Sequence, residues 1–144
     1  MRSAALACRR APFWYIRLMK RVLLIGIEPS KVDYSDPALP PGMTAEKIRA
    51  GIERGLADIQ ARGWIGDTCT VNPDETALPA VERQLAAHRY DCIVIGAGLR
   101  LPPNRLTLFE AVINAVRRGA PQSPIAFNTR PDDSGAAAAR WIKE

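Results

Sequence analysis

Four short apolar stretches alternate with segments of helical periodicity from residue 21 onward. Each stretch is bounded by polar or proline-containing residues, which predicts strands. The stretches are RVLLIGIE at 21–28, DTCTVNP at 67–73, DCIVIGAG at 91–98 and PIAFN at 124–128. The first and third are apolar almost throughout, as expected of strands that are buried on both faces of a parallel sheet.

The segments between these strands have the spacing of amphipathic helices. In residues 44–64 the apolar residues recur every three or four positions, Thr44 is a suitable N-cap and Gly63 a suitable C-terminal stop. The other predicted helices span 78–88, 107–119 and 132–144.

Two of the predicted helices carry capping signals at their start. Thr107 and Glu110 have the spacing of a capping box. The last helix is expected to be capped by Asp132, Asp133 or Ser134.

The order of the elements defines the fold class. A βαβαβαβα series with mostly short connections predicts an α/β protein in which helices cover both faces of a four-stranded parallel sheet. Right-handed crossovers leave few arrangements, and we favour the strand order 2-1-3-4. The expected fold is three-layered, Rossmann-like and flavodoxin-like, with its last strand missing. Residues 21–144 are expected to form a single domain of this kind.

The net charge is concentrated in the first twenty residues. The chain has a formal net charge of +5, and residues 1–20 supply it with four arginines, Lys20 and no acidic residue. The basic and acidic residues of 21–144 balance. A neutral domain lacks the basic face that phosphate backbones require, so no nucleic-acid partner is expected.

The basic N-terminal extension, residues 1–20, leaves several interpretations open. An arginine-rich, acid-free leader is typical of an organelle transit peptide or of a basic segment that binds a membrane surface. Alternatively, translation starts at Met19, directly before the first strand, and the preceding residues are an upstream addition or a disordered arm. The apolar run of the N-terminal extension is interrupted by Arg9 and Arg10, so no integral membrane segment is expected.

The cysteines and the single histidine argue against a metal centre. Cys8, Cys69 and Cys92 have no CxxC spacing, and the last two fall in predicted strands, where cysteine is usually a small buried residue. No ligand cluster surrounds His88. These features favour a reducing, cytoplasmic location.

The connection between the first strand and its helix is unusually long. It comprises residues 29–43, PSKVDYSDPALPPGM, whereas connections of this kind usually have two to six residues. Long loops in compact domains are often binding loops or lids. An equal alternative is that the connection only covers an apolar end of the sheet and binds nothing.

A ligand site in this fold belongs at the carboxyl ends of the strands, where the strand order reverses. With order 2-1-3-4, the crevice lies between the first and third strands, and three segments border it. They contain the candidate ligand-binding residues Tyr34, Gly96, Gly98, Arg100, Asn128, Thr129 and Arg130, and the candidate acid–base residues Glu28, Asp33 and Asp36.

The two arginines make an anionic ligand the leading hypothesis. Arg100 and Arg130 follow adjacent strands, and guanidinium groups hold carboxylates or phosphates with paired donors. Alternatively, these arginines pair with the acidic residues of the long connection. Gly96 and Gly98 either expose backbone N–H groups to an anion or only let the third strand turn without side-chain clashes.

Common nucleotide cofactors are disfavoured. The turn after the third strand has Leu101 at the third glycine position of a GxGxxG motif, prolines follow it, and no ribose-binding acid comes later, which argues against NAD(P). No GK[ST] is present, which excludes a P-loop. Pro29-Ser30-Lys31 is a poor phosphate loop for FMN. The cofactor, if any, stays unknown.

An acid at Glu28 and a hydroxyl at Thr129 stand where they do in the receiver domains of response regulators, and the layout is similar to that family. The position of the phosphoacceptor aspartate is Gly96, however, and no fifth strand with its lysine is expected. Phosphotransfer signalling is therefore not expected.

Two functional hypotheses follow from the sequence. The first is a small anionic ligand, bearing phosphate or carboxylate, in the crevice under the 29–43 connection, with or without acid–base chemistry. The second is a non-enzymatic, receiver-like interaction or regulatory module that acts as a homodimer, with Trp64, Phe109 and Trp141 as contact residues.

Overall fold

The computed structural model describes residues 12–143 and contains one parallel sheet. Its strands are β1 (Arg21–Ile27), β2 (Ile65–Val71), β3 (Cys92–Ile95) and β4 (Ile125–Phe127). The strand order is β2-β1-β3-β4, and all neighbouring pairs are parallel. The predicted α/β fold with order 2-1-3-4 and flavodoxin-like topology is confirmed.

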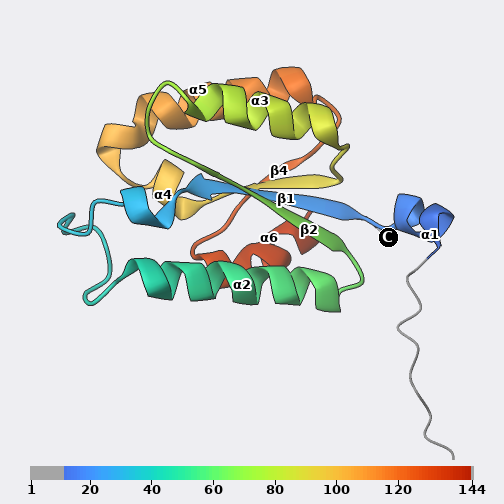
Figure 1. Ribbon diagram of the computed structural model, residues 1–144, viewed down its shortest axis with the longest axis horizontal. Coiled ribbons are helices and arrows are strands. Elements are labelled where there is room, and N and C mark those ends of the chain that lie inside the picture. The colour runs from blue at the N-terminus through green and yellow to red at the C-terminus, as the bar shows by residue number, and fades with distance from the viewer. Residues whose placement is uncertain (1–11, 144) are drawn as a thin grey trace, which may run out of the picture.

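Helices cover both faces of the sheet (Figure 1). One face carries α2 (Ala45–Ala61) and α6 (Ser134–Ala139), and the other carries α3 (Ala77–Ala87) and α5 (Leu106–Gly119). The shorter elements are α1 (Phe13–Leu18), η1 (Pro29–Lys31), α4 (Ala97–Arg100), η2 (Pro103–Arg105) and η3 (Pro131–Asp133). The short helix α4 lies at one end of the sheet and α1 at the opposite end (Figure 1).

The sheet separates two hydrophobic cores. Because successive side chains of a strand point to opposite faces, Leu23 and Ile25 of β1 pack in the core beneath α3 and α5, whereas Leu24 packs in the core towards α2 and α6. Cys69 and Cys92 are buried free thiols within strands, as expected, and burial raises the pKa of Cys92 to about 11.

The predicted ends of α2 are confirmed. Thr44 precedes the helix, and its Oγ1 accepts a hydrogen bond from the Lys47 N–H at 3.2 Å. Gly63 follows the helix with a φ of 82°, a conformation that favours glycine. Thr44 and Gly63 therefore mark where α2 begins and ends.

The residues predicted to cap the two later helices make no side-chain capping bond to them, although Asp133 does occupy the N-cap position of α6. No side-chain capping bond is made by Thr107, because η2 runs directly into α5 and places this residue inside the first helical turn. The carboxylate of Asp133 does not cap α6 either. Its Oδ1 instead accepts the Thr129 N–H at 3.1 Å, which ties down the turn after β4.

The N-terminal extension is only partly described. Residues 1–11 lie outside the described part of the chain, and so does most of its basic charge. Of the described residues, Phe13, Trp14 and Leu18 in α1 are exposed. Between residues 12 and 143, no helix has both the length and the apolar character needed to cross a bilayer.

Candidate functional site

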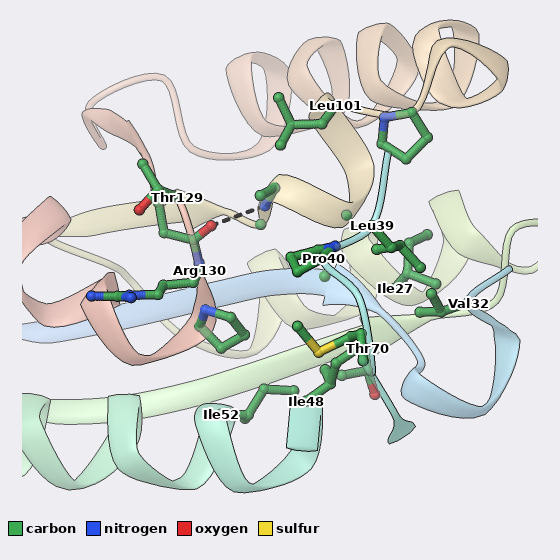
Figure 2. A pocket seen from close by; sticks show the side chains of 18 of the residues that line it. Ile27, Val32, Leu39, Pro40, Ile48, Ile52, Thr70, Leu101, Thr129 and Arg130 are labelled. Carbon is green, nitrogen blue, oxygen red and sulfur yellow. Dashed lines mark hydrogen bonds between the residues drawn. The ribbon is translucent and has the colours of Figure 1, made fainter. Parts of the chain in front are cut away.

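A cavity of about 290 Å³ lies at the carboxyl ends of the strands, on the side of the sheet that faces α2. Aliphatic side chains dominate its walls (Figure 2). In Figure 2, Ile48 and Ile52 project from α2 on one side, Leu101 lies on the opposite side, and Leu39 and Pro40 lie between them. The cavity is therefore suited to an apolar guest.

The floor of the cavity is formed by the ends of three neighbouring strands. Thr70 of β2 is in register with Gly26 of β1, and Gly96 follows the pairing of Ile25 with Ile95. A Cβ on Gly96 would lie 3.1 Å from the Ile25 carbonyl oxygen and 3.5 Å from the Gly26 Cα. Glycine at position 96 therefore permits close approach of the two strands. The floor combines bare backbone at Gly26 and Gly96 with the side chains of Leu24, Thr68 and Thr70.

The 29–43 connection forms one wall of this cavity, through Leu39, Pro40, Met43 and neighbouring residues. Local hydrogen bonds hold the connection in place: Tyr34 Oη donates to the Pro29 carbonyl at 2.6 Å, and Lys47 Nζ donates to the Gly42 carbonyl at 2.7 Å. The prolines and these bonds reduce the conformational freedom that a loop of this length would otherwise have.

The wall opposite the connection is formed by the residues after β4. Asn128 is 2% exposed; its Oδ1 accepts the Ala97 N–H at 2.9 Å and its Nδ2 donates to Ser134 Oγ at 3.1 Å. Pro131 packs against α2 at Gly55, where an added Cβ would overlap the Pro131 carbonyl oxygen. The segment is thus fixed to α4, α6 and α2 at the same time.

Six of the ten candidate residues from the sequence lie at the cavity and four do not. The lining residues are Asp36, Gly96, Gly98, Asn128, Thr129 and Arg130. The residues outside the lining are Glu28, Asp33, Tyr34 and Arg100. The ends of the strands thus bring most of the candidates together, while several charged groups point elsewhere.

The two arginines do not converge on one point. Arg100 donates from Nη2 to the Asn128 carbonyl at 2.8 Å, and its guanidinium carbon lies 5.5 Å from the centre of the Phe127 ring. Arg130 is exposed, and its Nε lies 3.3 Å from the Asp132 carboxylate. Figure 2 shows the Arg130 side chain extending away from Pro40 and Ile52. Arg100 therefore fastens α4 to the end of β4.

The acidic residues Glu28 and Asp33 both accept hydrogen bonds from neighbouring residues, Asp33 within the 29–43 connection and Glu28 also from β2 and α2. Burial acts to raise the pKa of Glu28, but hydrogen bonds from Ser30, Thr70 and Arg49 outweigh it and hold this pKa below its usual value. Hydrogen bonds from the Ser35 hydroxyl and N–H lower the pKa of Asp33. Both carboxylates are ionised at neutral pH and are weak bases.

Several cavity residues were not foreseen as part of a site. Ile48 and Ile52 belong to the apolar face that the sequence assigns to packing. Ile52 does pack against the core between the sheet and α2, and both side chains also border the cavity. Leu101 lines the cavity and is 59% exposed. The signal in the sequence is a leucine between a glycine turn and two prolines. In the sequence, no feature distinguishes Gly26 from the other residues of its apolar strand.

The contact residues of the dimer hypothesis differ in exposure. Trp64 is 7% exposed and belongs to the core between the sheet and α2, so it cannot serve as a surface contact. Trp141 is 55% exposed, whereas Phe109 is half-buried and packs against Phe127 at 5.9 Å between ring centres.

Residues 12–143 contain no group of three or more histidine, cysteine, aspartate or glutamate side chains placed to hold a metal ion.

Comparisons of the chain with protein-family models, with curated proteins and with solved structures give no match.

Proposed function

We propose that this protein binds a small molecule with an apolar body and one acidic group, in the cavity beside the 29–43 connection. The observation that carries the proposal is the cavity itself, which lies where the strand order reverses and has mostly aliphatic walls. Its volume of about 290 Å³ is close to the lower bound, roughly 300 Å³, of pockets that bind small molecules. The ligand is therefore small.

The acidic group of the ligand is assigned to the side of the cavity at Arg130. Of the described residues that line the cavity, Asp36 and Arg130 carry charge, and Asp36 Oδ1 already accepts the Ala38 N–H at 2.9 Å. The pair between Arg130 and Asp132 is exposed, and such pairs contribute about 0–1 kcal/mol. The Arg130 side chain extends away from the cavity in Figure 2, so binding requires it to leave Asp132 and turn towards the ligand carboxylate, at small cost.

The proposal is for binding, and acid–base chemistry receives less support. Glu28 and Asp33 are held in their ionised forms by hydrogen bonds and do not line the cavity. A general base at neutral pH needs a pKa near the working pH, which the lowered pKa values of these carboxylates do not provide.

The experiment is a fluorescence titration with 2-naphthoate, an apolar ring with one carboxylate, and with its neutral amide, 2-naphthamide. We expect saturable binding of the acid with about tenfold preference over the amide, since a charge-assisted hydrogen bond contributes roughly 1.5–3 kcal/mol. Arg130→Gln should abolish the preference. Arg118→Gln removes the same charge from the far end of α5 and should not. Failure of both compounds to bind the wild-type protein contradicts the proposal.

A further inference from the structure

Seven of the ten glycines in this chain are explained by the fold itself. At most of them an added Cβ would touch neighbouring atoms at 3.1 Å or less, and at the others φ is positive. The closely packed glycines are Gly55, Gly66, Gly96, Gly119 and Gly135, and those with positive φ are Gly42 and Gly63. Substitution at these positions would disturb the protein's own structure.

Of the other three, Gly51 lies in α2 outside the cavity lining, and Gly26 and Gly98 have no such reason either. An added Cβ at either position meets nothing within 4 Å, and neither has a positive φ. Both line the cavity. Glycine lowers stability inside a strand, as at Gly26, and inside a helix, as at Gly98 in α4. In a strand it often marks a site where a ligand or another backbone approaches closely. The space at these two glycines is open to a ligand and is not used by the fold.

We propose, on the basis of the proposed function, that Gly26 and Gly98 form a bare-backbone subsite for the apolar body of the ligand, and that this body is a flat ring system. Gly26 adjoins Gly96 across β1 and β3, and Gly98 continues the same surface into α4. Ile48 and Ile52 on α2 border the same cavity.

The flat shape follows from the absence of side chains at Gly26, Gly96 and Gly98. A ring lying on two adjacent strand ends touches peptide groups over its whole face, whereas an alkyl chain touches them along a line. A rigid ring also loses less conformational entropy on binding than a flexible chain with the same number of carbon atoms. Gly26 and Gly98 therefore determine which apolar group fits.

The test compares 2-naphthoate with octanoate on the full chain and on variants that fill the subsite. Gly26→Val and Gly98→Val should each weaken 2-naphthoate binding at least tenfold while the melting temperature stays at or above the wild-type value. Ala57→Val adds a similar volume on the exposed side of α2 and should leave the affinity unchanged within twofold. If Gly98→Val fails to fold, Gly98→Ala adds only the Cβ, for which the structure has room.

The outcomes separate this inference from the proposed function. If the wild-type protein binds neither 2-naphthoate nor octanoate, the proposed function fails. If it binds 2-naphthoate and the folded glycine variants bind it equally well, the subsite is overturned while the proposed function stands. Tighter binding of octanoate than of 2-naphthoate overturns the flat ring and leaves the proposed function intact.

Discussion

The carboxamide oxygen of Asn128 accepts a hydrogen bond from the backbone N–H of Ala97 at 2.9 Å, and this bond joins the end of β4 to the start of α4. The same side chain donates to Ser134 at the start of α6. Two sides of the cavity, the turn after β3 and the turn after β4, are thereby held at a fixed separation. This link is made by a neutral side chain that carries none of the charge expected of a ligand-binding group.

Replacement of Asn128 by alanine should destabilise the protein by roughly 2–3 kcal/mol. The residue is 2% exposed, and its removal leaves the Ala97 N–H without a partner, a cost of about 1–3 kcal/mol. The Ser134 hydroxyl loses one bond and keeps its bond to the Pro131 carbonyl. Chemical denaturation measures the change. Asn104→Ala, at an exposed position in η2, is the matched control and should stay within about 0.5 kcal/mol of wild type. An equal effect of both variants would refute the role given to Asn128.

Two glycines one turn apart on α2 should respond to alanine in opposite directions. A Cβ at Gly55 would overlap the Pro131 carbonyl oxygen, so Gly55→Ala should destabilise by roughly 1–3 kcal/mol and weaken 2-naphthoate binding by displacing a wall of the cavity. At Gly51 the nearest atom would be the Pro131 Cβ at 3.4 Å, an ordinary contact. Gly51→Ala should therefore stabilise by up to about 1 kcal/mol, because alanine favours the helix. Similar denaturation midpoints for the two variants would contradict this account.

The fold could be predicted because its signals are local or follow from general rules of topology. The residues of β1 and β3 form apolar runs that only a doubly covered parallel strand accommodates, and right-handed crossovers then limit the order of the strands. Local signals alone could not establish whether the capping box predicted at Thr107 forms. Whether Thr107 starts a helix depends on Pro103–Arg105, which already follow a helical path into α5.

The candidate site could be predicted as a region but not residue by residue. The carboxyl ends of parallel strands meet at one edge, so Gly96, Asn128 and Thr129 were expected there, and all of them line the cavity. The direction of a long side chain depends on partners that the sequence does not place. Arg100 finds the Phe127 ring and the Asn128 carbonyl and turns away from the cavity.

Arg100 should contribute to stability and not to ligand affinity. Arg100→Ala removes the hydrogen bond to the Asn128 carbonyl and the packing on Phe127, and we expect a loss of roughly 1–2 kcal/mol in the free energy of unfolding. The affinity for 2-naphthoate at a temperature where the variant is folded should stay within twofold of wild type. Unchanged stability together with lost binding would instead make Arg100 a ligand-binding residue.

The phenol of Tyr90 should make the protein sensitive to alkaline pH. Tyr90 is 2% exposed, donates to Asp67 Oδ2 at 2.9 Å and accepts from Gln84 Nε2 at 2.6 Å. Burial, with a contribution from the Asp67 carboxylate, raises its pKa from 10.0 to about 12. Because the folded state holds this proton more tightly than the unfolded state, the stabilisation is complete below pH 10 and is lost as the pH rises from 10 through 12.

The size of this alkaline loss follows from the two pKa values. A rise of about two units corresponds to roughly 2–3 kcal/mol in the free energy of unfolding. Denaturation of wild type and Tyr90→Phe at intervals between pH 8 and 12 isolates the contribution, because the buried Cys92 thiol, whose pKa is about 11, titrates in both proteins. The variant should be less stable at pH 8, since it lacks the bond to Asp67, and the difference should shrink above pH 10. Parallel stability curves over the whole range would show that Tyr90 keeps an ordinary pKa in the folded protein.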